Sequence, residues 1–108
     1  MERPHDYDSI TTLDISDKNL TELPFWISEC KKLENLNCSF NNITQLNNLP
    51  PTLEILYCKY NLIKQLDNLP ENIKLLYCVP NPLKYEFEPT IENIRNYNNQ
   101  NNQNKLPK

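Results

Sequence analysis

Hydrophobic residues recur along the chain in a frame that returns every twenty residues. Residues 53–63 read Leu-x-x-Leu-x-Cys-x-x-Asn-x-Ile, and residues 33–43 and 73–83 follow the same frame. The five slots are filled by Leu33, Leu53 and Ile73; by Leu36, Leu56 and Leu76; by Cys38, Cys58 and Cys78; by Asn41, Asn61 and Asn81; and by Ile43, Ile63 and Leu83. Self-similarity at such a period predicts a solenoid, in which stacked repeats bury one continuous core.

Each frame contains a short segment with the alternation of a β-strand. Leu56 and Cys58 are two positions apart, so on an extended segment they point to the same side, while Ile55, Tyr57 and Lys59 point to the other. Stacking the units places these segments side by side. The sequence therefore predicts a short parallel sheet on the concave side of the solenoid, with one face packed inward and the other open.

The asparagine slot and the return segment complete each turn. Asn61 comes where the chain must leave the sheet, and its amide can donate to and accept from backbone groups that no strand satisfies. Leaving such a group buried and unpaired costs about 1–3 kcal/mol. Leu66 and Leu69 then return apolar side chains to the core, and Pro70 disfavours a helix. We expect an extended or polyproline-like convex side.

The frame divides the chain into four units and two ends. The units span residues 10–32, 33–52, 53–72 and 73–90, a C-terminal cap spans residues 84–97, and together they make residues 1–97 one domain. The cap has two interpretations: a truncated fifth unit, or a short helix with Ile91, Ile94 and Tyr97 on one side. The tail, residues 98–108, is rich in Asn and Gln, which predicts disorder.

The first unit departs from the frame at the asparagine slot. Lys18 occupies that slot and Asn19 comes one residue later. Either the turn shifts by one residue or a different group satisfies the backbone there. The polar residues 1–9 form a lead-in, with Tyr7 placed to cover the end of the first coil.

The return of the first unit is longer than the others and is expected to contain one or two helical turns, through residue 30. Pro24 suits the first helical position. Phe25, Trp26 and Ile27 follow, and one helical turn cannot point all three inward. We expect Trp26 to cover an end of the solenoid or to lie on the surface.

Over roughly residues 10–90 the chain resembles leucine-rich-repeat proteins. The units with Leu-Pro near their ends, NNLPPTLEILYC and DNLPENIKLLYC, resemble the short repeats of bacterial secreted effectors. The chain also resembles leucine-rich-repeat proteins of large DNA viruses, in the cysteine at the sixth position of the frame and in its abundant asparagine. The resemblance implies an α/β leucine-rich-repeat solenoid with a mostly extended convex side and at most a short helix, in the first repeat.

Composition restricts the possible partners and the compartment. The net charge is −3, with acidic and basic residues dispersed rather than clustered, which argues against a nucleic-acid groove. No apolar run approaches a membrane span, and residues 1–9 lack the apolar core of a signal peptide. We expect a monomer in the cytoplasm, or in the host cytoplasm if the source is a virus or an intracellular bacterium. The chain has no glycine, so turns that need a positive φ are expected to use its Asn and Asp residues.

The four cysteines do not have the spacing of a metal site. Cys38, Cys58 and Cys78 are twenty residues apart in the inward slot, and the single histidine, His5, is far from them in sequence. We interpret them as small apolar fillers in a reducing compartment, and we expect Cys30 to pack on the return side of the first unit. No metal, cofactor or catalytic residue is predicted, because no Ser/His/Asp pattern and no glycine-rich phosphate loop can be placed.

The second half of the open face carries aromatic and aliphatic residues that core packing does not require. They are Phe40, Ile55, Tyr57, Tyr60, Leu75, Tyr77 and Val79. Such residues also suit strands for their own sake, and the tail or the cap could fold over them. An exposed apolar patch usually marks a contact, so we expect a non-catalytic interaction module that binds a protein or peptide. Two alternatives are the substrate-targeting fragment of a ubiquitin-ligase-type effector that lacks its catalytic domain, and a relic of a longer repeat protein.

Overall fold

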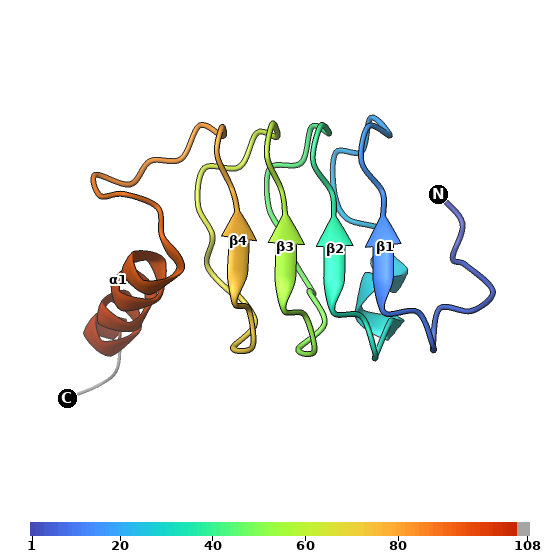
Figure 1. Cartoon of the computed structure of the whole chain (residues 1–108). Coiled ribbons are helices and arrows are strands. Elements are labelled where there is room, and N and C mark those ends of the chain that lie inside the picture. Colours follow the sequence, from blue (N-terminus) through green and yellow to red (C-terminus); the bar gives the residue numbers. More distant parts are fainter. Residues whose placement is uncertain (106–108) are drawn as a thin grey trace.

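The chain forms four coils stacked side by side, each contributing one strand to a single sheet (Figure 1). The computed structural model describes residues 1–105. The strands are β1 (Thr12–Asp14), β2 (Asn35–Asn37), β3 (Ile55–Tyr57) and β4 (Leu75–Tyr77). The sheet order is β1-β2-β3-β4, and all neighbouring strands are parallel. The predicted α/β solenoid with a short parallel sheet is confirmed.

The register of the sheet follows the repeat frame. Leu13, Leu36, Leu56 and Leu76 pair across the four strands. The side chains of Leu36 and Leu56 are fully buried, whereas those of their strand neighbours Ile55 and Tyr57 are half-buried on the other face. The alternation read from the sequence therefore separates an inner face, which forms the core, from an open one.

Three cysteines form a buried column within this core. Cys38, Cys58 and Cys78 lie on the inner side of successive coils, and all of them are free thiols. Burial raises the pKa of Cys38 to about 12 and raises the pKa of Cys58 well above its ordinary value. The thiols therefore stay protonated in the folded chain, as expected of apolar fillers.

This column predicts a loss of stability at alkaline pH. At pH values well below the pKa of a free thiol, about 8.5, the thiols are protonated in both states and their contribution to stability is fully present. Between that value and the pKa of the folded chain, only the unfolded chain releases thiol protons. Each thiol therefore lowers the free energy of unfolding by about 1.4 kcal/mol for every pH unit in this range. Urea unfolding of the wild type and of Cys58→Ala at pH 7, 9 and 10 tests this. The variant should start lower and lose less between pH 9 and pH 10; parallel losses would contradict the assignment.

The asparagine column bridges neighbouring coils. The Asn61 amide nitrogen donates to the carbonyl oxygens of Cys38 and Cys58, at 3.0 and 3.2 Å, and its oxygen accepts from the Ile43 amide at 3.0 Å. Asn81 bonds in the same way one coil later, to the carbonyls of Cys58 and Cys78. Each asparagine thus satisfies backbone groups of its own coil and of the preceding one, as the frame predicts.

The turn of the first unit is satisfied by a residue of the second unit. The Asn41 side-chain oxygen accepts from the amides of Lys18 and Leu20, both at 3.0 Å. The backbone turns through Asp17 and Asn19, which have φ angles of 54° and 55°. Lys18 can therefore occupy the asparagine slot without contributing its side chain, since no coil precedes it.

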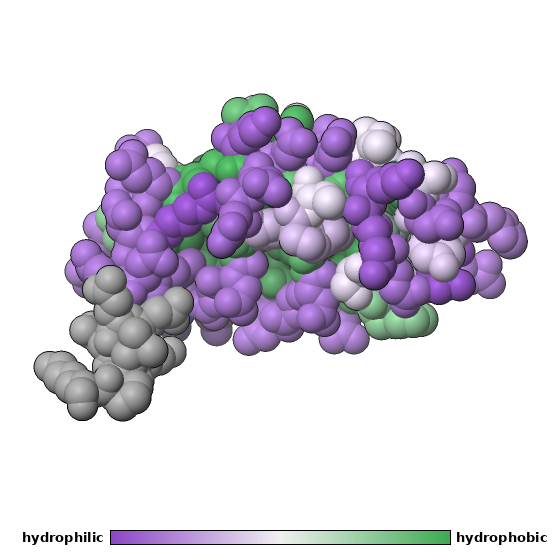
Figure 2. Space-filling model, turned by 90° about the horizontal axis from the view of Figure 1, so that it is seen from below, coloured by the Kyte–Doolittle hydropathy of each residue, from purple (hydrophilic) through white to green (hydrophobic). Residues whose placement is uncertain are grey.

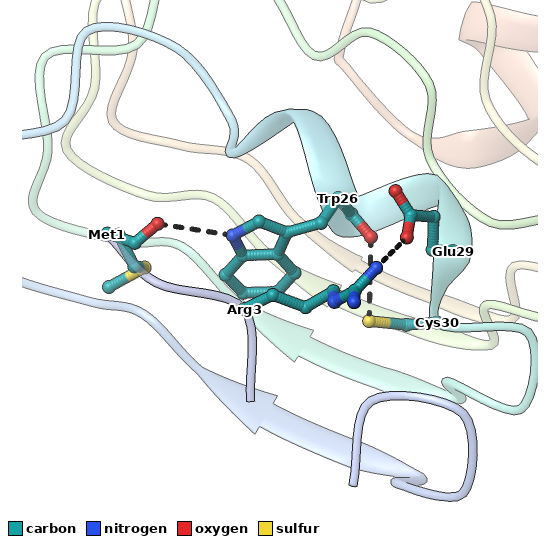
Figure 3. A network of polar contacts seen from close by, with 5 residues as sticks. All are labelled: Met1, Arg3, Trp26, Glu29 and Cys30. Carbon is teal, nitrogen blue, oxygen red and sulfur yellow. Dashed lines mark hydrogen bonds and ion pairs between the residues drawn. The ribbon is translucent and has the colours of Figure 1, made fainter. Parts of the chain in front are cut away.

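The return of the first unit contains the predicted short helix, η1, a 3₁₀ helix over Phe25–Glu29. The prediction for Trp26 is wrong: its side chain is 1% exposed, and it is Phe25 that lies outside, 81% exposed. Trp26 can enter the core because its indole nitrogen finds a partner there, the Met1 carbonyl oxygen at 3.2 Å (Figure 3). Cys30 is buried directly after the helix, as expected.

The N-terminal lead-in closes the first coil. Arg3 forms an ion pair with Glu29 of η1 (Figure 3), and its guanidinium lies 4.0 Å from the centre of the Tyr7 ring. Tyr7 itself packs against the core, as predicted. Residues 1–9 therefore cover the end of the solenoid at which the core would otherwise be open.

The C-terminal end is closed by a helix and not by a fifth unit. Helix α1 spans Ile91–Lys105 and lies at the opposite end of the sheet from the N-terminus (Figure 1). Ile94 is fully buried, and the rings of Tyr85, Phe87 and Tyr97 form a contact cluster, with centroids 4.7–5.7 Å apart. Of the two interpretations of residues 84–97, the helical cap is the one observed, with its helix beginning at Ile91.

The expected disorder from residue 98 is not what the structure shows. Helix α1 continues to Lys105, and Asn98 donates to the carbonyls of Leu66 and Asp67 at 2.9 and 3.0 Å. Arg95, one turn earlier, donates to the Pro70 and Glu71 carbonyls. These tertiary contacts anchor the segment in spite of its composition. The rest of the predicted tail, residues 106–108, lies outside the described residues.

Candidate functional site

The predicted contact residues lie on β3 and β4, the strands nearer α1, and in the turns that directly follow β2, β3 and β4. Ile55 pairs with Leu75, and Tyr57 with Tyr77, across β3 and β4. Leu75 and Val79 are about half exposed, and Ile55, Tyr57 and Tyr77 are partly buried. The structure therefore brings four of these residues together on the adjacent strands β3 and β4, with Val79 two residues beyond the end of β4.

Four aromatic residues of this region form two stacked pairs. The Tyr57 and Tyr77 rings have centroids 4.6 Å apart and an interplanar angle of 5°. The Phe40 and Tyr60 rings are also 4.6 Å apart, at 14°. This separation is close to the spacing of adjacent strands, about 4.8 Å. Each pair is thus a direct consequence of repeating an aromatic residue at the same slot of successive coils.

Phe40 and Tyr60 lie not on the strands but at the corner that follows them, where the backbone is left-handed. Their φ angles are 59° and 56°, so the expectation that only Asn and Asp take positive φ is wrong at these two positions. Asp17 takes the same conformation in the equivalent slot of the first unit. The corner requires it because the Phe40 and Tyr60 amides donate to carbonyls of the next coil. A bulky side chain costs about 1–2 kcal/mol there, and such strain is often found at functional sites.

The other half of the open face is polar and carries a negative charge. Asp14 of β1 is exposed, and its Oδ1 accepts from the Ser16 hydroxyl at 2.6 Å and from the Ser16 amide at 2.9 Å. These hydrogen bonds lower the pKa of Asp14, so the carboxylate is ionised at neutral pH. On β2 the same face carries Asn35 and Asn37. The face thus changes from acidic to polar to aromatic along the sheet.

Two further residues of the region were not predicted as contacts. Lys59 places its ammonium nitrogen 5.7 Å from the centre of the Tyr77 ring. Leu62 is 49% exposed, just beyond the Asn61 turn. Both occupy outward slots of the third unit, and that is the sequence signal that could have identified them.

The end of the molecule at which the strands begin is mainly hydrophilic. Figure 2 views the molecule from this end, and there hydrophobic residues reach the surface only in small separate areas between polar ones. Phe25 is an exposed aromatic residue on the return side of the first unit. The apolar surface on consecutive strands is therefore a feature of the open face.

The chemistry available to this face is recognition. Among residues 1–105, no three His, Cys, Asp or Glu side chains come together as possible metal ligands. In the same part of the chain, no helix is long and apolar enough to cross a membrane. The face presents aromatic rings, aliphatic side chains, one lysine and one carboxylate, which are groups that bind a partner by packing and charge.

The sequence was compared with known families, curated proteins and solved structures. Residues 8–51 match the family described as leucine-rich repeats, in two copies. No curated protein and no solved structure gave a significant match. The matched segment covers β1 and β2, and β3 and β4 continue the same register in the structure.

Proposed function

This chain is a leucine-rich-repeat protein, and we propose that it binds a protein or peptide through the open face of its sheet. Leucine-rich-repeat domains are general protein-interaction modules. The contact residues are those predicted from the sequence, Phe40, Ile55, Tyr57, Tyr60, Leu75, Tyr77 and Val79, together with Lys59. The role is that of a non-catalytic binding partner.

The exposed stack of Phe40 on Tyr60 carries this proposal. Phe40 and Tyr60 are 57% and 51% exposed, although each holds a backbone conformation that asparagine would adopt at lower cost. Neither residue is in the buried core. Large aromatic residues retained at strained and exposed positions are better explained by a contact than by stability.

The size of the face restricts what it can hold. Four strands at about 4.8 Å spacing, with a few residues of about 3.3 Å each, span only a few hundred square ångströms. A standard protein interface takes about 800 Å² from each partner. The face is thus suited to a short peptide segment or to one projecting loop of a larger protein.

The test is affinity capture from a cell extract with the wild type and with the double variant Tyr57→Ala/Tyr77→Ala. We expect at least one protein to be retained by the wild type and lost from the double variant, because removing both rings removes most of the apolar contact area on β3 and β4. Quantitative mass spectrometry of the retained proteins is the measurement.

Phe25→Ala is the matched control, because it removes an exposed aromatic ring on the return side of the first unit. It should retain the same proteins as the wild type. Circular dichroism establishes that all variants are folded. Identical sets of proteins on the wild type and on the folded double variant would remove the face from consideration.

A further inference from the structure

One row of outward side chains crosses all four strands and changes character at β2. Asp14 pairs with Asn37, Asn37 with Tyr57, and Tyr57 with Tyr77. The rings of Tyr57 and Tyr77 stand side by side, whereas the two positions before them carry short polar side chains. We call the space above Asn37, between the Tyr57 ring on one side and the Asp14 carboxylate on the other, the notch, with Asn37 as its floor and these two side chains as its aromatic and polar walls.

The aromatic wall presents a free ring face to the notch. Tyr77 covers one face of the Tyr57 ring at a centroid distance of 4.6 Å, and the opposite face is directed towards β2. A planar group lying above Asn37 would continue this stack by one more strand spacing, about 4.8 Å. The nearby Lys59 directs its ammonium nitrogen to Tyr77, 5.7 Å from the ring centre.

Hydrogen bonds to neighbours in the same segment hold the side chains of Asp14, the polar wall, and Asn37, the floor, close to the sheet. Asn37 Oδ1 accepts from the Ser39 amide at 3.0 Å, and Asp14 Oδ1 accepts from Ser16. Both side chains bend towards the end of the strand, so neither fills the notch. Among the hydrogen bonds of residues 1–105, Asp14 uses Oδ1 alone, and Oδ2 of this exposed carboxylate remains available.

From this geometry we propose that the notch binds an arginine side chain of the partner. This inference rests on the proposed function and specifies which partner chemistry the face selects. The guanidinium plane stacks on the Tyr57 ring above Asn37, and its opposite face is turned towards the carboxylate of Asp14, which attracts its charge. Two strand spacings, about 9–10 Å, separate the backbones of β1 and β3, which leaves room for a planar group between the two walls.

The notch favours arginine over the other cationic side chain. A guanidinium is flat and weakly hydrated, so one of its faces can stack on the Tyr57 ring while the other lies towards the Asp14 carboxylate. A lysine ammonium is compact and strongly hydrated, so it can satisfy Asp14 or Tyr57 but not both with equal geometry. The aliphatic part of the arginine would lie on Ile55, next to Tyr57 on the same face.

The test uses decapeptides selected from a random phage-displayed library on the immobilised chain, with recovered clones screened for loss of binding to Tyr57→Ala/Tyr77→Ala. Arginine should be enriched among the clones that depend on the tyrosines. A synthetic peptide of this class should lose about tenfold in affinity when its arginine is replaced by citrulline, which has the same shape and no charge. Replacement by lysine should weaken binding to a smaller extent.

Asp14→Asn should weaken the arginine peptide about threefold to fivefold and leave the citrulline peptide unchanged, as measured by fluorescence polarisation. Asparagine keeps the acceptor for Ser16, so the fold is retained. Asp17→Asn, at the left-handed corner of the same unit, is the charge-matched control and should bind both peptides as the wild type does.

The two proposals fail in different ways. Tyrosine-dependent peptides without arginine, or an arginine peptide that binds Asp14→Asn and wild type equally, would overturn the notch and leave the binding face intact. A lysine peptide as tight as the arginine peptide would overturn the stacking on Tyr57. Selection that recovers no tyrosine-dependent peptide would overturn the proposed function and the notch with it.

Discussion

Leu56→Ala is expected to lower the free energy of unfolding by about 2–5 kcal/mol. Leu56 is fully buried at the centre of β3, and its strand partners Leu36 and Leu76 lie on both sides, so neither neighbouring coil can close over the cavity. A small domain has only about 5–10 kcal/mol in total. The variant should therefore lose a large part of its stability, and the midpoint of urea unfolding is the measurement.

The effect should extend beyond the third coil. In a solenoid each repeat is stabilised by its neighbours, so a cavity at the centre weakens both the contact with β2 and the contact with β4. Lys64→Ala, an exposed change in the same unit, should stay within about 0.5 kcal/mol of the wild type. Equal midpoints for Leu56→Ala and Lys64→Ala would contradict the packing of the leucine column.

The stacking of the coils could be predicted because each slot has a local physical reason that repeats. Leu56 and Cys58 share a strand face by the period of two, and Asn61 stands where a turning backbone needs both donors and acceptors. Because the units repeat, each slot pairs with the same slot of the next unit, and the alternation within one strand thereby sets the register of the whole sheet. For the same reason the stacking of Tyr57 on Tyr77 follows from the sequence once the register is known.

The departures occur where a residue is determined by a contact made only once. Trp26 is inside because the Met1 carbonyl meets its indole nitrogen, a contact over 25 positions that no repeat slot encodes. Helix α1 runs past residue 98 because Asn98 reaches the carbonyl of Leu66. A further departure is repeated from coil to coil: Phe40 and Tyr60 are left-handed because their amides reach carbonyls of the next coil, irrespective of their own preference.

The candidate site could be predicted only in part. Outward slots identify Tyr57 and Tyr77 as neighbours, but they do not distinguish a strand residue from a corner residue such as Tyr60. The notch is a property of unlike residues in one register row, with Asp14 and Tyr57 two strands apart. To predict the notch from the sequence, the irregular first unit must be paired correctly with the second unit. The shifted asparagine slot makes that pairing hard to find.

Asn61→Ala is expected to lower the free energy of unfolding by about 2–4 kcal/mol, comparable with the loss of a core leucine. Truncation leaves the buried Ile43 amide unpaired, which costs about 1–3 kcal/mol. It also removes one of the two asparagine donors of the Cys38 carbonyl and of the Cys58 carbonyl, which keep Asn41 and Asn81 as their other donors. The three terms do not add fully, because water can enter the shortened side chain's place. Urea unfolding is again the measurement.

Two comparison variants separate the hydrogen bonds from the loss of a side chain. Asn42→Ala changes the adjacent, exposed asparagine, whose backbone amide still donates to the Leu20 carbonyl, and should be nearly silent. Asn61→Asp keeps the shape and the acceptor but loses the paired donors, so it should be destabilised at pH 7. Burial raises the pKa of the new carboxyl, and stability should therefore return in part as pH falls and the protonated acid donates again.

That pH dependence distinguishes a donor requirement from a packing requirement. If Asn61→Asp were as stable as the wild type at pH 7, the carbonyls of Cys38 and Cys58 would not need the amide. The asparagine column would then be a filler of turns, and the coils would be held together by the leucine and cysteine columns alone. A deficit that shrinks on acidification requires instead that the column bonds one coil to the next.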